Sequence, residues 1–107
     1  MTAHRIRIIG IPPGEAPLGV REKWVGLELP LQPGRTGAYQ LPCVGVLSKK
    51  DNRGPVIGYL VAADEAVRIL ESKAPDAASW WRAHAATSIS PGKALMFDEY
   101  VCEPIED

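Results

Sequence analysis

The sequence predicts an α+β domain: a small, mainly antiparallel five-stranded β-barrel or strongly bent sheet, with two short helices between strands 4 and 5. Three observations predict this class. Residues 55–61 open with a proline and form a run rich in β-branched and aromatic residues that no charge interrupts, which is typical of a core strand. Residues 65–74 repeat apolar side chains at helical spacing. The 10 glycines and 10 prolines are scattered along the chain, which indicates short strands and tight turns.

The whole chain, residues 1–107, is expected to form a single globular domain. Its 107 residues are enough for one core and too few for two. Hydrophobic residues make up 46% and charged residues 23%, and these values allow a packed core. Short strands joined by many turns usually curl so that few edges stay exposed, which is why a barrel or strongly bent sheet is expected.

The N-terminal part supplies the first two strands. In residues 4–11, two arginines alternate with isoleucines before further apolar residues, so this strand should start half exposed and end covered. Residues 12–17 are rich in proline and are expected to form a turn or crossing loop. A single helical turn at 18–23 leads into a second strand at 24–31, and Pro30 indicates that this strand lies at an edge or ends in a bulge.

The middle of the chain is predicted to form a hairpin followed by two helices. Residues 41–48 form the third strand, and the polar run after it leads back into the strand at 55–61. Asp64 is the expected N-cap of the first helix, because its carboxylate can accept from N–H groups in the first turn. A second helix should begin at Asp76. The predicted apolar face of the first helix consists of Ala63, Ala66, Val67, Ile69, Leu70 and Ala74.

The last predicted strand, residues 93–104, loses its alternation halfway. Leu95 and Phe97 share one face, whereas the tyrosine and cysteine that follow fall on the other. One extra residue would bring all four side chains to the same face. We therefore expect a β-bulge near Asp98 and Glu99, with both carboxylates exposed.

Charge and cysteine content exclude several classes of protein. The net charge is −1 and no basic run occurs, which argues against nucleic-acid binding. No segment approaches the roughly 20 apolar residues of a membrane span. The first residues lack the apolar region of a signal peptide, so we expect a cytoplasmic protein. Cys43 and Cys102 are accordingly expected to be reduced and buried rather than bridged.

The sequence predicts no metal site, no cofactor and no catalytic residue. Its two histidines and two cysteines lack the spacing of metal ligands, and neighbouring acids near 98–103 would point to opposite faces of a strand. Neither a phosphate-binding glycine motif nor a nucleophile elbow is present. Cys43 could form a nucleophile only with a distant histidine, and a buried structural role is the favoured alternative.

Two groups of residues are candidates for a binding surface. Trp80, Trp81 and His84 share one side of the second helix, where they could stack on a planar ligand. Packing of the two indoles in the core is the favoured alternative for this group. Arg21 and Trp24 follow the proline-rich loop and could stand at the mouth of a pocket, where arginine would bind a carboxylate or phosphate. Here the favoured alternative is a solvated turn with one anchoring tryptophan.

These candidates lead to three hypotheses about function. The first is a non-enzymatic binding or interaction module, for which we expect a protein partner or self-association. Its binding face would consist of Arg21, Trp24, Tyr59, Trp80, Trp81 and His84. The second is a small ligand-binding barrel or enzyme with a pocket under the helices, in which His84 acts as acid/base beside Glu22 or Asp98. The third is an accessory inhibitor or immunity-type protein.

The shape of the aromatic surface should discriminate between these hypotheses. A pocket of roughly a few hundred Å³ that His84 and a carboxylate both face would favour a small molecule or catalysis. A flat aromatic patch would favour a protein partner.

Three parts of the sequence carry a resemblance to other proteins. The first part is residues 20–27, and the second comprises 58–61 together with 78–84. The third comprises residues 97–98 and 101–103. Together they resemble small uncharacterised bacterial proteins of about this length, and this resemblance implies a bacterial, cytoplasmic, single-domain protein. It implies no activity, catalytic residue or cofactor.

Overall fold

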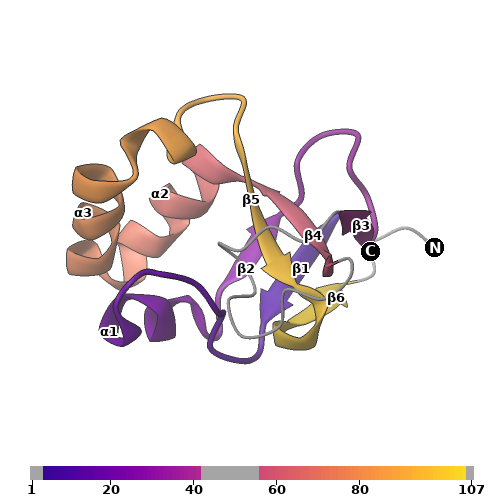
Figure 1. Ribbon diagram of the computed structural model, residues 1–107, viewed down its shortest axis with the longest axis horizontal. Coiled ribbons are helices and arrows are strands. Elements are labelled where there is room, and N and C mark those ends of the chain that lie inside the picture. The colour runs from indigo at the N-terminus through magenta and orange to yellow at the C-terminus, as the bar shows by residue number, and fades with distance from the viewer. Residues whose placement is uncertain (1–3, 42–55, 106–107) are drawn as a thin grey trace.

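The computed structural model describes residues 4–41 and 56–105. In these residues, six strands form two three-stranded antiparallel sheets, and the α-helices gather at one end of the molecule (Figure 1). A single bridge between Leu31 and Val61 links the sheets. The antiparallel α+β class is therefore confirmed. The predicted barrel is wrong for the described residues, because the strands are divided between two sheets instead of closing into one.

The first sheet has the order β2-β1-β6 and is built from β1 (Arg5–Ile8), β2 (Glu28–Pro30) and β6 (Cys102–Ile105). The alternation in β1 is as predicted, with both isoleucines of the strand fully buried. The strand ends before the predicted residue 11, and Ile9 and Ile11 are exposed where the chain leaves the sheet. Pro30 lies in the edge strand β2, which confirms its predicted place.

Ion pairs connect all three strands on the outer face of this sheet. Glu28 of β2 accepts hydrogen bonds from Arg5 at 3.0 Å and from Arg7 at 2.8 Å. Arg7 also donates to Glu103 of β6 at 3.1 Å. The hydrogen bond from Arg7, followed by its charge, lowers the pKa of Glu28 below the ordinary value of 4.5.

These carboxylates predict acid sensitivity of the fold. A similar contact with Arg82 lowers the pKa of Glu71. A carboxylate with a lowered pKa stabilises the folded state fully above its unfolded pKa and loses this effect as the pH falls through its folded pKa. The melting temperature should therefore fall as the pH is lowered from 7 to 3. The variant carrying Glu28→Gln and Glu71→Gln should melt lower at pH 7 but lose less on acidification; equal losses in both proteins would contradict this account.

The second sheet has the order β3-β4-β5, with β3 (Tyr39–Leu41), β4 (Val56–Ala62) and β5 (Ala94–Asp98). The strand predicted at 55–61 is thus confirmed as the central strand of an antiparallel sheet. Strand β3 pairs antiparallel with β4, but it shares only Leu41 with the predicted third strand at 41–48. The remainder of the predicted third strand, residues 42–48, and the polar run at 49–54 lie outside the described residues.

The predicted pair of helices and the predicted helical turn at 18–23 are present, but the described residues contain more helical segments than these. Helices α2 (Ala63–Lys73) and α3 (Pro75–His84) lie between β4 and β5, but α1 (Leu18–Arg21) and the 3₁₀ helix η1 (Glu22–Trp24) precede β2. Residues 24–27 are consequently not part of the second strand, since η1 and a turn occupy the start of the predicted range. A further 3₁₀ helix, η2 (Ala86–Ile89), follows α3.

Helix α2 packs its apolar face on the core and joins α3 through an ion pair. The buried residues on this face are Ala63, Ala66, Val67 and Leu70, which confirms the predicted face. The predicted N-cap is wrong: Ala62 occupies that position, and Asp64 accepts from the backbone N–H of Glu65 inside the first turn. Arg82 of α3 holds Glu71 of α2 through two hydrogen bonds of 2.8 and 3.0 Å. Helix α3 starts at Pro75, because proline has no N–H to leave unpaired at a helix start.

A 3₁₀ helix interrupts the last predicted strand, so the expected β-bulge is wrong. In η3 (Glu99–Val101), the side chain of Asp98 accepts from the backbone N–H of Tyr100 at 3.0 Å. This turn carries the chain from β5 in one sheet to β6 in the other. Tyr100 is 84% exposed and does not join the apolar face. Asp98 and Glu99 are half-buried and not exposed as predicted.

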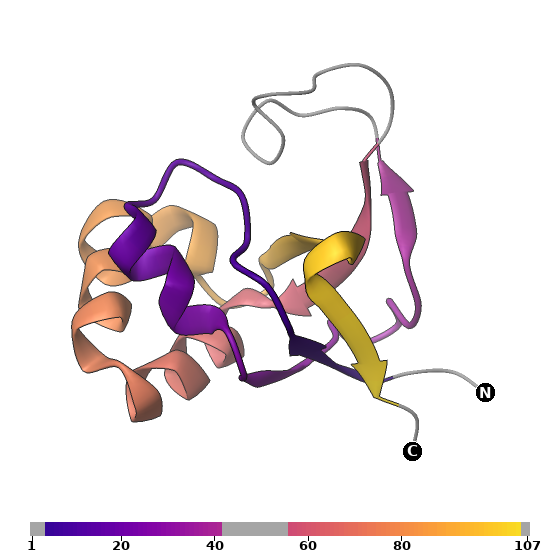
Figure 2. The same cartoon turned by 90° about the horizontal axis from the view of Figure 1, so that it is seen from below.

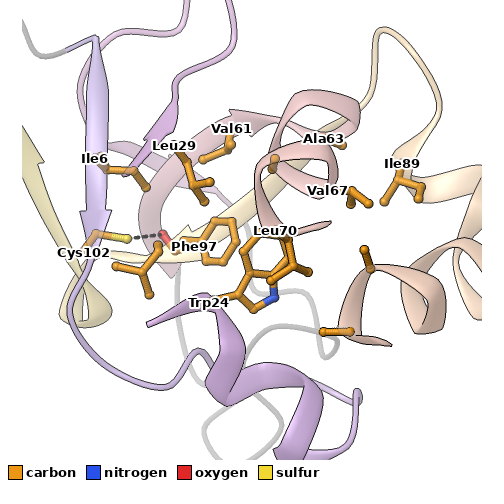
Figure 3. Packing of buried hydrophobic residues seen from close by; sticks show 14 of the residues in the cluster. Ile6, Trp24, Leu29, Val61, Ala63, Val67, Leu70, Ile89, Phe97 and Cys102 are labelled. Carbon is orange, nitrogen blue, oxygen red and sulfur yellow. Dashed lines mark hydrogen bonds between the residues drawn. The ribbon is translucent and has the colours of Figure 1, made fainter. Parts of the chain in front are cut away.

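The core lies where the two sheets meet the helices (Figure 3). Trp24, Leu70 and Phe97 come together there from η1, α2 and β5. Cys102 is buried and free, and burial followed by the charge of Asp98 raises its pKa to about 12. This thiol is therefore unreactive at neutral pH; Cys43 lies outside the described residues. None of the helices in residues 4–41 and 56–105 has the length and apolar character to cross a membrane.

Candidate functional site

A pocket of about 410 Å³ lies between the proline-rich loop, the α1–η1 turn, helix α3 and strand β5. Arg21, Trp24 and Trp81 all line it, so three of the predicted site residues share one cavity. Loop residues 12–16, strand residues 94–97, Leu60 and Ser88 also line the cavity. Figure 2 shows how the segment between β1 and α1 runs from the sheets to the helical end of the molecule.

Arg21 fixes the proline-rich loop to the end of α1. Its Nε donates to the carbonyl oxygen of Ala16 at 2.7 Å, and its Nη1 donates to that of Pro12 at 3.1 Å. Prolines restrict the loop backbone, and these two bonds fix both of its ends to one side chain. Arg21 is half-buried and forms no ion pair with any residue of 4–41 or 56–105.

Aromatic rings continue from the pocket along α3. Trp24 meets Phe97 edge to face with ring centroids 5.2 Å apart, and it meets Trp81 at 5.9 Å. Trp81 in turn contacts Trp80 at 5.4 Å, and His84 stacks on Trp80 at 4.8 Å. Edge-to-face contacts at these distances are favourable beyond the area they bury. We call these five side chains the aromatic row.

The aromatic row divides the predicted binding residues into two groups. Trp24 is 1% exposed and Trp81 is half-buried, so both indoles are walls fixed by packing. Trp80 and His84 lie outside the lining of this pocket. His84 is exposed at the end of α3, with its Nδ1 3.0 Å from the carbonyl oxygen of Trp80. The four side chains therefore do not form one continuous binding surface.

Trp80 lines a second cavity, of about 310 Å³, at the junction of α2 and α3. Lys23 and Lys73 line this cavity as well. A hydrogen bond holds the side chain of Lys73 in place, because its Nζ donates to the carbonyl oxygen of Val25. None of the residues known to line this second cavity has a buried side-chain N or O atom without a hydrogen-bond partner, as far as residues 4–41 and 56–105 are concerned.

Tyr59 does not belong to the pocket. It lies on β4 opposite Phe97 of β5, is half-buried and packs against the core. The two carboxylates proposed to act with His84 are also absent from the lining of the 410 Å³ pocket. Glu22 is exposed in η1, and the side chain of Asp98 accepts a hydrogen bond from the backbone N–H of Tyr100 at the start of η3.

Sequence reasoning missed the contribution of β5 to the pocket. β5 is an edge strand of its sheet, so the consecutive residues 94–97 all reach the cavity although their side chains alternate. It also missed the loop at 12–16. The signal for the loop was present in the chain: a rigid, proline-rich segment directly before a helical turn that carries Arg21 and Trp24.

The polar groups of the pocket are few. Trp81 Nε1 is buried and finds no acceptor in the described part of the chain. Glu15 is the acidic residue of the described lining, and it is exposed. No group of three histidine, cysteine or acidic side chains in residues 4–41 and 56–105 could hold a metal ion. The site is thus an apolar recess with one half-buried arginine.

Comparison of the chain with family models, curated proteins and solved structures found no match. The resemblance to small bacterial proteins therefore stays a prediction, and the pocket has to be interpreted from its own geometry.

Proposed function

We propose that this protein is a small non-enzymatic binding module that takes the apolar part of a small molecule into the 410 Å³ pocket. The observation that carries this proposal is the presence of Arg21, Trp24 and Trp81 in one lining. Ligand pockets are typically concave, largely apolar and furnished with a few polar groups. A recess of this size supports ligand binding over the flat aromatic face that a protein partner would favour.

The lining gives no support to an enzymatic role. A general acid or base must reach the proton that it transfers. His84 lies outside both cavities of the described residues, and so do Glu22 and Asp98. The proposal is therefore restricted to binding.

Self-association is a second candidate function, and an exposed apolar area supports it. The backbone N–H of Ile9 donates to the carbonyl oxygen of Val101, so Ile9 lies beside the turn that carries Tyr100. Both side chains are exposed, and so is Ile11. This area could receive a second copy of the chain or another protein, including the target of an inhibitor-type protein. A concentration-dependent mass on a sizing column, abolished by Tyr100→Ser, would support this candidate.

The pocket can be tested with a neutral aromatic probe and a filling variant. Ser88 of η2 lines the cavity and is exposed, so Ser88→Phe should place a ring in the recess at little cost to the fold. Its neighbour Thr87 is exposed and absent from the lining, so Thr87→Phe is the matched control. Binding of 2-naphthamide, followed by amide chemical shifts, should perturb residues 94–97 in the wild type and the control. It should weaken at least about tenfold in Ser88→Phe, which corresponds to about 1.4 kcal/mol.

Two results would overturn the proposal. One is the absence of any shift in residues 94–97 at millimolar probe. The other is equal binding by both phenylalanine variants. Melting curves of the two variants would establish that each remains folded.

A further inference from the structure

We propose that the pocket is built for an apolar small molecule that carries a carboxylate, with the guanidinium of Arg21 as the group that receives it. This inference rests on the proposed binding function. It adds the chemical class of the ligand and names the residue that selects its charge.

Arg21 retains N–H donors that no group in the described part of the chain accepts. An arginine side chain has five N–H donors, and its bonds to Ala16 and Pro12 use two of them. Three N–H groups therefore have no acceptor in the described residues. Because one Nη1 bond and the Nε bond fix the plane of the guanidinium, the remaining donors are held in a defined orientation. Fixed donors suit a planar carboxylate, which can accept two parallel hydrogen bonds.

The surroundings of Arg21 favour an anion. Guanidinium groups at protein surfaces commonly pair with acidic side chains, as Arg5, Arg7 and Arg82 do with glutamates here. Arg21 has no such pair with any residue of 4–41 or 56–105, although it is half-buried against apolar walls. The acidic residue of the described lining, Glu15, is exposed, so water and salt screen its repulsion of a bound anion. A ligand carboxylate could bind the guanidinium directly, which no carboxylate in residues 4–41 and 56–105 does.

The size and walls of the cavity define the rest of the ligand. A volume of about 410 Å³ lies at the lower end of the range for small-molecule sites. The lining includes the rings of Trp24, Trp81 and Phe97, of which half-buried Trp81 keeps the most surface for a planar or branched apolar body. The ring of a compact aromatic acid would pack against the apolar lining, and its carboxylate would bind Arg21.

Three probes with the same ring test the charge preference on the unaltered protein. They are 2-naphthoate, the neutral 2-naphthamide and the cationic 2-naphthylmethylammonium. We expect the naphthoate to bind at least about tenfold more tightly than the amide, because a hydrogen bond to a charged group is worth more than a neutral one. The ammonium probe should bind more weakly than the amide. Only the naphthoate should lose affinity as salt is raised.

The variant Arg21→Gln assigns this preference to one residue. Loss of the arginine also releases the loop, so the amide probe serves as a control for the shape of the pocket. We expect Arg21→Gln to bind naphthoate and naphthamide equally. If both probes instead lose affinity by the same factor and naphthoate keeps its advantage, Arg21 supports the loop only and the inference is overturned.

The outcomes separate the inference from the proposed function. If naphthamide binds at residues 94–97 and naphthoate binds no better, the pocket takes apolar ligands and the carboxylate preference is wrong. If neither probe shifts these residues, both proposals are wrong. Tighter binding of acetyl-Gly-Gly-Phe than of naphthoate would replace the small molecule by the end of a peptide chain.

Discussion

Replacing Trp24 with alanine is expected to lower the free energy of unfolding by about 3–5 kcal/mol, the usual cost of removing a buried tryptophan. Trp24 is 1% exposed and stands between Phe97 of the second sheet and Trp81 of α3. Its removal would leave a cavity that these two rings cannot both fill. Because small domains are stable by only about 5–15 kcal/mol, this change should remove a large part of the total.

Urea denaturation followed by far-ultraviolet circular dichroism measures this loss. Trp80→Ala is the matched control, since it removes the same side chain from a half-buried position at the second cavity. We expect it to cost no more than about half as much, because less of its surface is withdrawn from water. Equal losses for Trp24→Ala and Trp80→Ala would contradict the central position assigned to Trp24.

Replacing Gly58 with alanine is expected to cost about 2–3 kcal/mol, at the upper end of the usual penalty for overpacking. Gly58 lies in the central strand β4, between Tyr39 of β3 and Asp98 of β5. A Cβ at this position would lie 2.4 Å from the carbonyl oxygen of Phe97 and 2.8 Å from Cε of Met96. The methionine could move, but the carbonyl belongs to the backbone of β5, so the sheet itself would have to shift.

Gly19→Ala is the matched control for this change. Gly19 lies in α1, and no atom comes within 4 Å of a Cβ built there. Alanine is the better helix former, so this variant should be neutral or more stable by about 0.5–1 kcal/mol. Thermal and urea unfolding of both variants would check the contrast. A Gly58→Ala protein as stable as the wild type would show that β4 and β5 are not packed as described.

The elements that the sequence predicted well are those whose period is local. The central strand β4 and the apolar face of α2 were both found, because β-branched runs and helical spacing can be recognised within a few residues. Boundaries were less accurate. Asp64 is a good N-cap by type, yet the helix starts before it, since Ala63 is drawn into the core.

The division of the strands between two sheets could not be predicted from local patterns. The chain changes sheets at η3, where one hydrogen bond from the backbone of Tyr100 to Asp98 replaces the expected bulge. Both solutions insert residues at the same point and differ only in how the flanking strands are later paired. That pairing depends on β1, which lies more than 90 residues away from β6 in the chain.

The candidate site was predicted only in part, because some of its residues come together through contacts between distant parts of the chain. Arg21 and Trp24 are close in sequence, and their placement at a pocket followed from the loop before them. Trp81 reaches this pocket only because α3 packs against the α1–η1 turn, a tertiary contact that no local pattern encodes. Trp80 and His84 were grouped with Trp81 by their position on one helix. In the structure, Trp80 lines the second cavity and His84 stacks on Trp80.

The binding account is tested most directly by nuclear Overhauser contacts between the ring protons of bound 2-naphthoate and the side chains of the protein. The account predicts contacts to Met96 and Phe97 of β5 and to the indole of Trp81. Contacts to Tyr100 and Ile9, with none to β5, would contradict it and would place binding on the exposed apolar area instead.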